Sequence, residues 1–129
     1  MDVSGGEDPR TPPADDFGLF ILSIALNVEQ ATNTSHRIAT LVSAAKSAME
    51  KQRLGVCQSD FNFAMDKFWK AYAQARDRAY KEVTGSIKDG TNAVIHCENL
   101  YKRSHLQSPI IGEIQNVTKI TDITLSMIK

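Results

Sequence analysis

The stretch that decides the fold is "LGVCQSDFNFAMDKFWKAYAQA", residues 54–75. Its apolar residues recur at steps of three and four from Leu54 onward, the spacing that places side chains on one face of an α-helix. Cys57 lies on this stripe, and Trp69 widens it. The polar residues fall largely on the opposite side. We therefore predict a helix over 52–77 that buries its apolar face against other helices.

A longer stripe of the same spacing precedes it. Apolar residues recur from Phe17 to Val42, with Ser35 in one of the slots, and no Pro or Gly interrupts the pattern after Gly18. This pattern predicts a helix over 14–46. The break between the two helices is expected around the "EKQRLG" that ends in a glycine.

Two weaker patterns follow. The third helix is expected over 83–101, although Gly85 and Gly90 lie within it. A glycine inside a helix costs about 1 kcal/mol relative to alanine, so each of them alternatively marks a kink or a close helix contact. The segment 110–127 is rich in β-branched residues, but its three-four spacing favours a helix over a strand.

Four amphipathic helices with short connections and no strand signals predict an all-α protein, an antiparallel up-down-up-down four-helix bundle. The 129 residues suffice for one domain. Residues 1–13 are rich in Gly, Pro and acidic side chains and are expected to be a flexible lead. Residues 14–129 are expected to form the bundle domain.

The charge balance argues against two classes of partner. Fifteen basic residues match fifteen acidic ones, whereas binding to nucleic acid or to an anionic membrane needs a basic excess or patch. The longest apolar run, residues 17–26, is interrupted and too short to cross a bilayer. We therefore expect neither a nucleic-acid nor a membrane partner.

The sequence carries mixed signals about its compartment. No signal peptide is visible after Met1, which suggests a cytosolic chain or a mature or truncated piece of a longer one. Two N-x-[ST] sequons, at Asn33 and Asn116, would fit secretion and are candidate N-glycosylation sites.

The only two cysteines both lie on apolar stripes. Cys57 is near the start of one predicted helix and Cys97 near the end of the next, forty residues later. An antiparallel pair of helices brings both positions to the same end of the bundle, so a disulfide is geometrically natural. Two buried thiols are the alternative.

Catalytic and metal sites have little support. The chain has no C-x-x-C or H-x-x-x-H spacing, and its three histidines are scattered. No motif for a nucleophile with its base or for phosphate binding is present. We expect neither a cofactor nor a metal, and no enzyme activity.

The turn between the second and third helices is the candidate partner contact, because Tyr and Arg are favoured at binding hot spots. An ordinary exposed turn is the alternative, and the stacking of nucleic acid on the "KFWKAYAQARDRAYK" segment is a weaker one. The candidate target-binding residues are Arg76, Asp77, Arg78, Tyr80 and Lys81.

Several stretches resemble the plant invertase inhibitor and pectin methylesterase inhibitor family. The resemblance runs over about residues 7–128, and the forty-residue spacing of the cysteines is typical of the family. The stretches that carry it are "DPRTPPADDFGLFILSIALNVEQAT" (8–32), "LGVCQSDFNFAMDKFWKAYAQA" (54–75), "VIHCENLY" (94–101) and "NVTKITDITLSMI" (116–128).

The resemblance implies a secreted protein of the plant cell wall whose second and third helices are joined by a Cys57–Cys97 disulfide. It implies an inhibitor that binds a pectin methylesterase or an acid invertase and occludes its active-site cleft without covalent chemistry. In the pectin methylesterase inhibitors the outer faces of the helices cover the cleft. In the invertase inhibitors a Pro-Lys-Phe turn between the second and third helices approaches it. We expect a monomer that needs no cofactor.

The sequence also departs from the family pattern. The N-terminal helical hairpin of the family, with its own cysteine pair, has no counterpart here, and "GTNAVIH" replaces the usual small-residue stretch before the last cysteine. The turn "ARDRAYKE" contains no Pro-Lys-Phe, which favours a pectin methylesterase target. The alternatives are a non-inhibitory secreted bundle with a structural or storage role and an intracellular helical adaptor.

Overall fold

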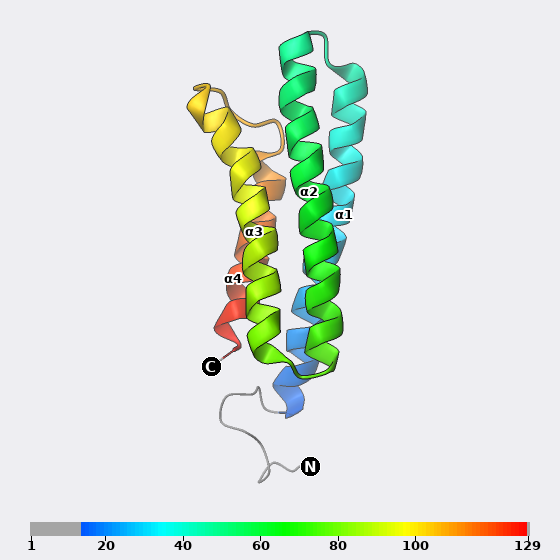
Figure 1. Cartoon of the computed structure of the whole chain (residues 1–129), viewed down its shortest axis with the longest axis vertical. Coiled ribbons are helices and arrows are strands. Elements are labelled where there is room, and N and C mark those ends of the chain that lie inside the picture. Colours follow the sequence, from blue (N-terminus) through cyan, green and yellow to red (C-terminus); the bar gives the residue numbers. More distant parts are fainter. Residues whose placement is uncertain (1–13, 129) are drawn as a thin grey trace.

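The computed structural model describes residues 14–128, and these form an antiparallel bundle of four α-helices without a strand. The helices are α1 (Ala14–Ala44), α2 (Ala48–Arg76), α3 (Tyr80–Arg103) and α4 (Ile111–Ser126). They run alternately up and down, with α1 beside α2 and α3 beside α4 (Figure 1). The predicted fold class is confirmed. The expected lead over 1–13 lies outside the described residues.

The predicted start of the second helix was wrong by four residues. The connection lies at 45–47, and Ser47 caps the helix by accepting a 3.0 Å hydrogen bond from the backbone N–H of Glu50. Ser47 and Glu50 form an S-x-x-E pattern, which is the signature of a capped helix start. Gly55 lies inside the helix and does not end it.

The core is built from all four helices and is mainly apolar. Three phenylalanines, Tyr101 and both cysteines are at most 1% exposed. Trp69, which was expected to widen the buried face of α2, is 55% exposed, so that expectation was wrong. Tyr72 and Met65 are half-buried and mark the edge of the buried face of α2. Trp69 lies beyond this edge on the helix surface.

Polar side chains cross the core between neighbouring helices. Asn27 of α1 donates from Nδ2 to Thr124 Oγ1 of α4 at 3.3 Å, and that hydroxyl lies 2.8 Å from Ser23 Oγ. Ser35 of α1 donates to Asn62 Oδ1 of α2 at 2.7 Å. Such contacts favour one register between helices, because any slip would leave a buried polar group unpaired.

The two glycines of α3 have different roles. A Cβ added at Gly90 would lie 2.5 Å from the Phe68 ring, whereas one at Gly85 would meet nothing within 4 Å. Gly90 therefore marks a close contact between α2 and α3, one of the two roles that the sequence left open for these glycines.

Among the described helices, none combines the length and the apolar character that crossing a membrane requires.

Candidate functional site

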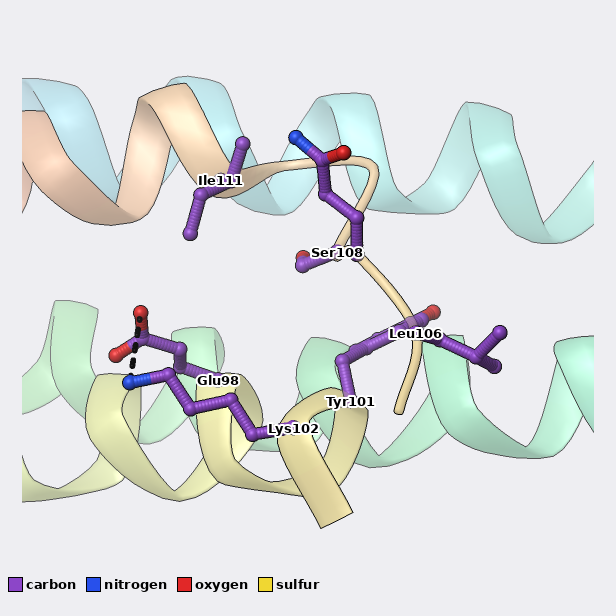
Figure 2. A pocket seen from close by; sticks show the side chains of 7 residues that line it. Glu98, Tyr101, Lys102, Leu106, Ser108 and Ile111 are labelled. Carbon is purple, nitrogen blue, oxygen red and sulfur yellow. Dashed lines mark ion pairs between the residues drawn. The ribbon is translucent and has the colours of Figure 1, made fainter. Parts of the chain in front are cut away.

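A small pocket lies at the end of α3, beside the connection to α4 (Figure 2). Its volume is about 200 Å³. A carboxylate and an ammonium group, Glu98 and Lys102, lie 3.6 Å apart on its wall, and Leu106 and Ile111 supply apolar surface. The pocket is at the opposite end of the bundle from the α2–α3 turn (Figure 1).

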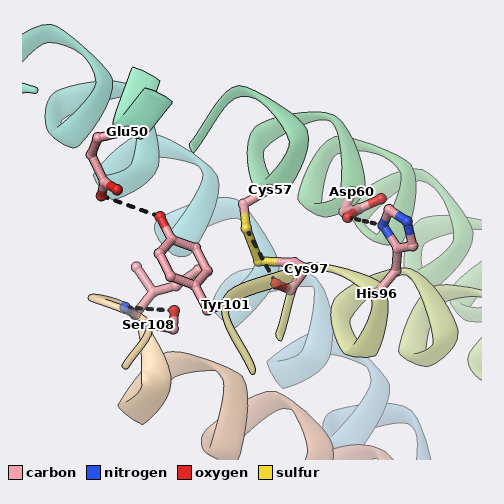
Figure 3. Close-up of a disulfide and its surroundings, with 8 residues drawn as sticks. Glu50, Cys57, Asp60, His96, Cys97, Tyr101 and Ser108 are labelled. Atoms are coloured by element: carbon pink, nitrogen blue, oxygen red, sulfur yellow. Dashed lines mark hydrogen bonds and ion pairs between the residues drawn. A yellow bond between two sulfur atoms is a disulfide. The ribbon is translucent and has the colours of Figure 1, made fainter. Parts of the chain in front are cut away.

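The predicted pairing of the cysteines is confirmed. Cys57 of α2 and Cys97 of α3 form a disulfide with an S–S distance of 2.09 Å and a Cα–Cα distance of 4.8 Å. Both residues are fully buried. The alternative of two buried thiols is therefore set aside. The bond joins α2 and α3 in the interior of the bundle (Figure 3).

Two polar contacts flank the disulfide on the same helix pair (Figure 3). His96 Nδ1 lies 2.7 Å from Asp60 Oδ2. His96 precedes Cys97 by one residue, and Asp60 follows Cys57 by three residues. On the other side, the Tyr101 hydroxyl donates to Glu50 Oε2 at 3.2 Å. The disulfide and these two polar contacts together fix α2 against α3.

Burial and the neighbouring Glu50 carboxylate raise the pKa of Tyr101 to about 12, from an ordinary value of 10.0. The folded protein therefore holds this proton more tightly than the unfolded chain does. The stability that depends on it is complete below about pH 10 and is lost as the pH rises towards 12.

We expect Tyr101→Phe to remove this pH dependence. As the pH rises from about 10 towards 12, the free energy of unfolding should fall more steeply in the wild type than in the variant. The difference in slope should be up to about 1.4 kcal/mol per pH unit. Urea unfolding across the window measures the difference, and tyrosinate absorbance reports the titration directly. Tyr72→Phe is the control, and a parallel loss in wild type and Tyr101→Phe would contradict the assignment.

The α2–α3 turn ends α2 in a Schellman motif. The Arg78 N–H donates to the Ala75 carbonyl at 3.0 Å, and the Ala79 N–H donates to the Gln74 carbonyl at 2.9 Å. Arg78 has a φ of 60°, the left-handed conformation that glycine usually supplies at this position. A side chain other than glycine costs about 1 kcal/mol or more there.

Aromatic side chains of α1 lie against this turn. The Arg78 guanidinium carbon is 3.9 Å from the centroid of the Phe17 ring, in cation–π geometry. The Tyr80 ring is 5.6 Å from that of Phe20, and the Tyr80 hydroxyl is buried. The turn is therefore packed on the first two turns of α1.

The structure separates the five residues predicted to contact a target into two groups. The side chains of Arg76, Asp77, Arg78 and Lys81 are exposed at the turn. Tyr80 is half-buried, and its hydroxyl points into the protein. Four of the five therefore share one exposed surface, and their contact with a partner stays a prediction. The role of Phe17 was not foreseen, because its spacing indicated only a core position.

The two sequons lie on one face of the bundle. Asn33 of α1 and Asn116 of α4 are both exposed. Each lies about one helical turn from the ion pair between Arg37 Nε and Glu113 Oε2, whose atoms are 2.6 Å apart. Glycosylation of either asparagine stays a prediction.

Within residues 14–128, no three His, Cys, Asp or Glu side chains gather in a way that could hold a metal ion. His36 and His105 are exposed, and His96 is paired with Asp60. The features that remain are a rigid, disulfide-linked helical bundle and a charged turn fixed at one end.

Comparison with known proteins finds relatives of this chain that are named as plant inhibitors. The chain is 28% identical over 123 residues to Pectinesterase inhibitor 5 of Arabidopsis thaliana, covering 93% of the chain and 69% of that protein. It is 28% identical over 97 residues to Cell wall / vacuolar inhibitor of fructosidase 2 of the same plant, covering 74% of the chain and 54% of that protein. A relative from Platanus orientalis, 22% identical over 125 residues, bears a name that refers to invertase inhibition, and the match covers 96% of the chain and 74% of that protein.

No profile of a known protein family matches the chain. The resemblance to the invertase and pectin methylesterase inhibitors is nevertheless confirmed by these relatives. All three are named as inhibitors and none as an enzyme, in agreement with the expectation that the chain has no catalytic function.

Proposed function

We propose that this protein is a proteinaceous inhibitor of a plant cell-wall pectin methylesterase or acid invertase, which it blocks by covering the active-site cleft. The observation that supports this most is the relation to a pectinesterase inhibitor along 93% of the chain. The disulfide between α2 and α3 agrees with what the family resemblance implies.

The geometry suits inhibition by occlusion. A rigid surface loses little conformational entropy on binding, and α2 and α3 are fixed by a disulfide and two side-chain hydrogen bonds. The turn presents the cations of Arg76, Arg78 and Lys81. Glycoside hydrolases such as invertases act through a pair of carboxylates, so a cationic turn is attracted to such a cleft.

Pectin methylesterase is the favoured target. The turn lacks the Pro-Lys-Phe of the invertase inhibitors, and Pectinesterase inhibitor 5 matches more of the chain than the fructosidase inhibitor does. The inhibitor would act as a monomer in the cell wall, where its targets are found.

The test is a titration of the purified, oxidised protein into a plant pectin methylesterase and, separately, into an acid invertase at mildly acidic pH. We expect residual activity of one enzyme to fall linearly to near zero at one equivalent. No loss of either activity, from protein shown to be folded and disulfide-bonded, would favour the non-inhibitory bundle.

A pair of double variants then locates the contact. We expect Arg76→Ala with Lys81→Ala to raise the inhibition constant by about tenfold or more, because two exposed cations leave the proposed contact. Lys46→Ala with Lys51→Ala removes the same charge at the opposite end and should leave the inhibition constant unchanged. Equal effects of the two double variants would show that net charge, and not the turn, matters.

A further inference from the structure

The α2–α3 turn is held by a contact from a distant part of the chain. Arg78 occupies the left-handed position of the Schellman motif, where glycine would be less strained. Its guanidinium group stacks on Phe17, sixty-one residues earlier in the sequence. The Phe17 ring in turn lies 6.4 Å from the ring of Phe20, which packs on Tyr80. The residues on both sides of Ala79 are thus tied to α1.

The end of α3 gives an internal comparison. His105 also has a positive φ, 57°, in a second Schellman motif formed by the N–H groups of His105 and Leu106. Among the described residues, no aromatic ring stacks on His105. A side chain at this strained position therefore does not in itself require a stacked aromatic ring from another helix. The contact with α1 is particular to the turn that carries Arg78.

We propose that Phe17 is a positioning residue for the α2–α3 turn. By stacking on Arg78, it holds the turn in a single conformation and fixes where the cations of Arg76 and Lys81 point. Phe17 itself would not touch the target. This inference rests on the proposed function, which supplies the reason for holding the turn in place. The effect of Phe17 on the conformation of the turn can nevertheless be measured without any target enzyme.

The physical basis is a local opening equilibrium. Leaving the left-handed conformation relieves strain in the turn, so a contact that only the closed form makes, such as the one with Phe17, shifts the equilibrium towards that form. A cation–π contact at an exposed site changes such an equilibrium by roughly two- to fivefold. Without the ring, the turn would open more often, and the apparent affinity would fall in proportion to the lost fraction of the closed form, which is at most this factor.

The first readout is the rate of trypsin cleavage in the turn of the native protein. Phe17→Leu removes the ring, keeps an apolar side chain and leaves the cleavage sites after Arg76, Arg78 and Lys81 intact. We expect cleavage in the turn to be about two- to fivefold faster, since slow proteolysis follows the population of the open form. Cleavage after Arg103, next to the second Schellman motif, should not change.

Phe63→Leu is the matched control. The Phe63 ring also carries a cation, with Lys67 Nζ 5.4 Å from its centroid, but it lies on the outer side of α2 away from the turn. This variant should cleave in the turn at the wild-type rate. Equal cleavage of Phe17→Leu and wild type would overturn the proposal. So would equal acceleration in both variants, or acceleration that follows a matching loss of global stability in urea.

The second readout is the inhibition constant against whichever enzyme the wild type inhibits. We expect Phe17→Leu to raise it by at most about two- to fivefold, the factor by which the opening equilibrium changes, and Phe63→Leu to leave it unchanged. A rise well above about fivefold would show that Phe17 contacts the target itself, which would overturn its role as a positioning residue. If the wild type inhibits neither enzyme, the proposed function fails, while the cleavage rates still decide whether Phe17 holds the turn.

Discussion

Replacing Cys57 and Cys97 together by alanine should lower the free energy of unfolding by about 4 kcal/mol. The disulfide joins residues forty positions apart, and closing a loop of that length restricts the unfolded chain by this amount in the chain-entropy model. The expected loss is a large part of the 5–15 kcal/mol or so that a domain of this kind has in total. The double variant should therefore be folded but fragile.

Urea unfolding of the wild type and the double variant, monitored by far-ultraviolet circular dichroism, measures this loss. Because both cysteines are fully buried, a mild thiol reductant should reduce the wild-type bond only as fast as the protein opens. A stability loss below about 1 kcal/mol would show that the bond adds little to what helix packing already provides.

Gly90→Ala should destabilise the protein by about 1–3 kcal/mol, although alanine is the better helix former. The new methyl group would lie 2.5 Å from the fully buried Phe68 ring, and overpacking in a tight core costs this much. Gly85→Ala on the same helix meets nothing within 4 Å and should stabilise by up to about 1 kcal/mol. Thermal or urea unfolding of both variants tests the opposite signs.

A double variant separates the clash from other effects of the substitution. Phe68→Leu removes the ring that the new methyl group meets, so Gly90→Ala should cost less in that background than in the wild type. A coupling free energy near zero between the two substitutions would mean that the loss at Gly90 arises elsewhere.

The helices could be predicted from the sequence because each buries one wide face, and that face leaves a three-four pattern. The predicted start of α2 at 52 does not use the capping pattern of Ser47 and Glu50, which the sequence already contains and which begins the helix at Ala48. The exposure of Trp69 could not be predicted in the same way. A residue at the edge of a stripe is covered or exposed according to how the neighbouring helix is rotated.

The candidate site was predictable to a different degree. The pairing of Cys57 with Cys97 followed from helix lengths and the family resemblance together. The stacking of Arg78 on Phe17 could not be predicted in this way. It depends on a left-handed backbone conformation at Arg78, which the local preferences of arginine do not favour. The burial of the Tyr80 hydroxyl depends on the same packing of the turn against α1.

The interface between α1 and α4 differs in kind from that between α2 and α3. The buried positions of α4 are Ile114, Val117, Thr121 and Thr124, so half of them are threonines. Thr124 meets Asn27, whose Oδ1 has no hydrogen-bond partner. α4 is also the shortest of the four helices, and the disulfide does not involve it.

The bundle therefore has two parts of unequal durability. The hairpin of α2 and α3 stays together even when the surrounding structure loosens, since a covalent bond crosses it. By contrast, α4 is the shortest helix and half of its buried residues are threonines, so we expect it to detach and return while the rest of the fold persists. In hydrogen exchange this protein is expected to consist of a slow central hairpin and a faster C-terminal helix.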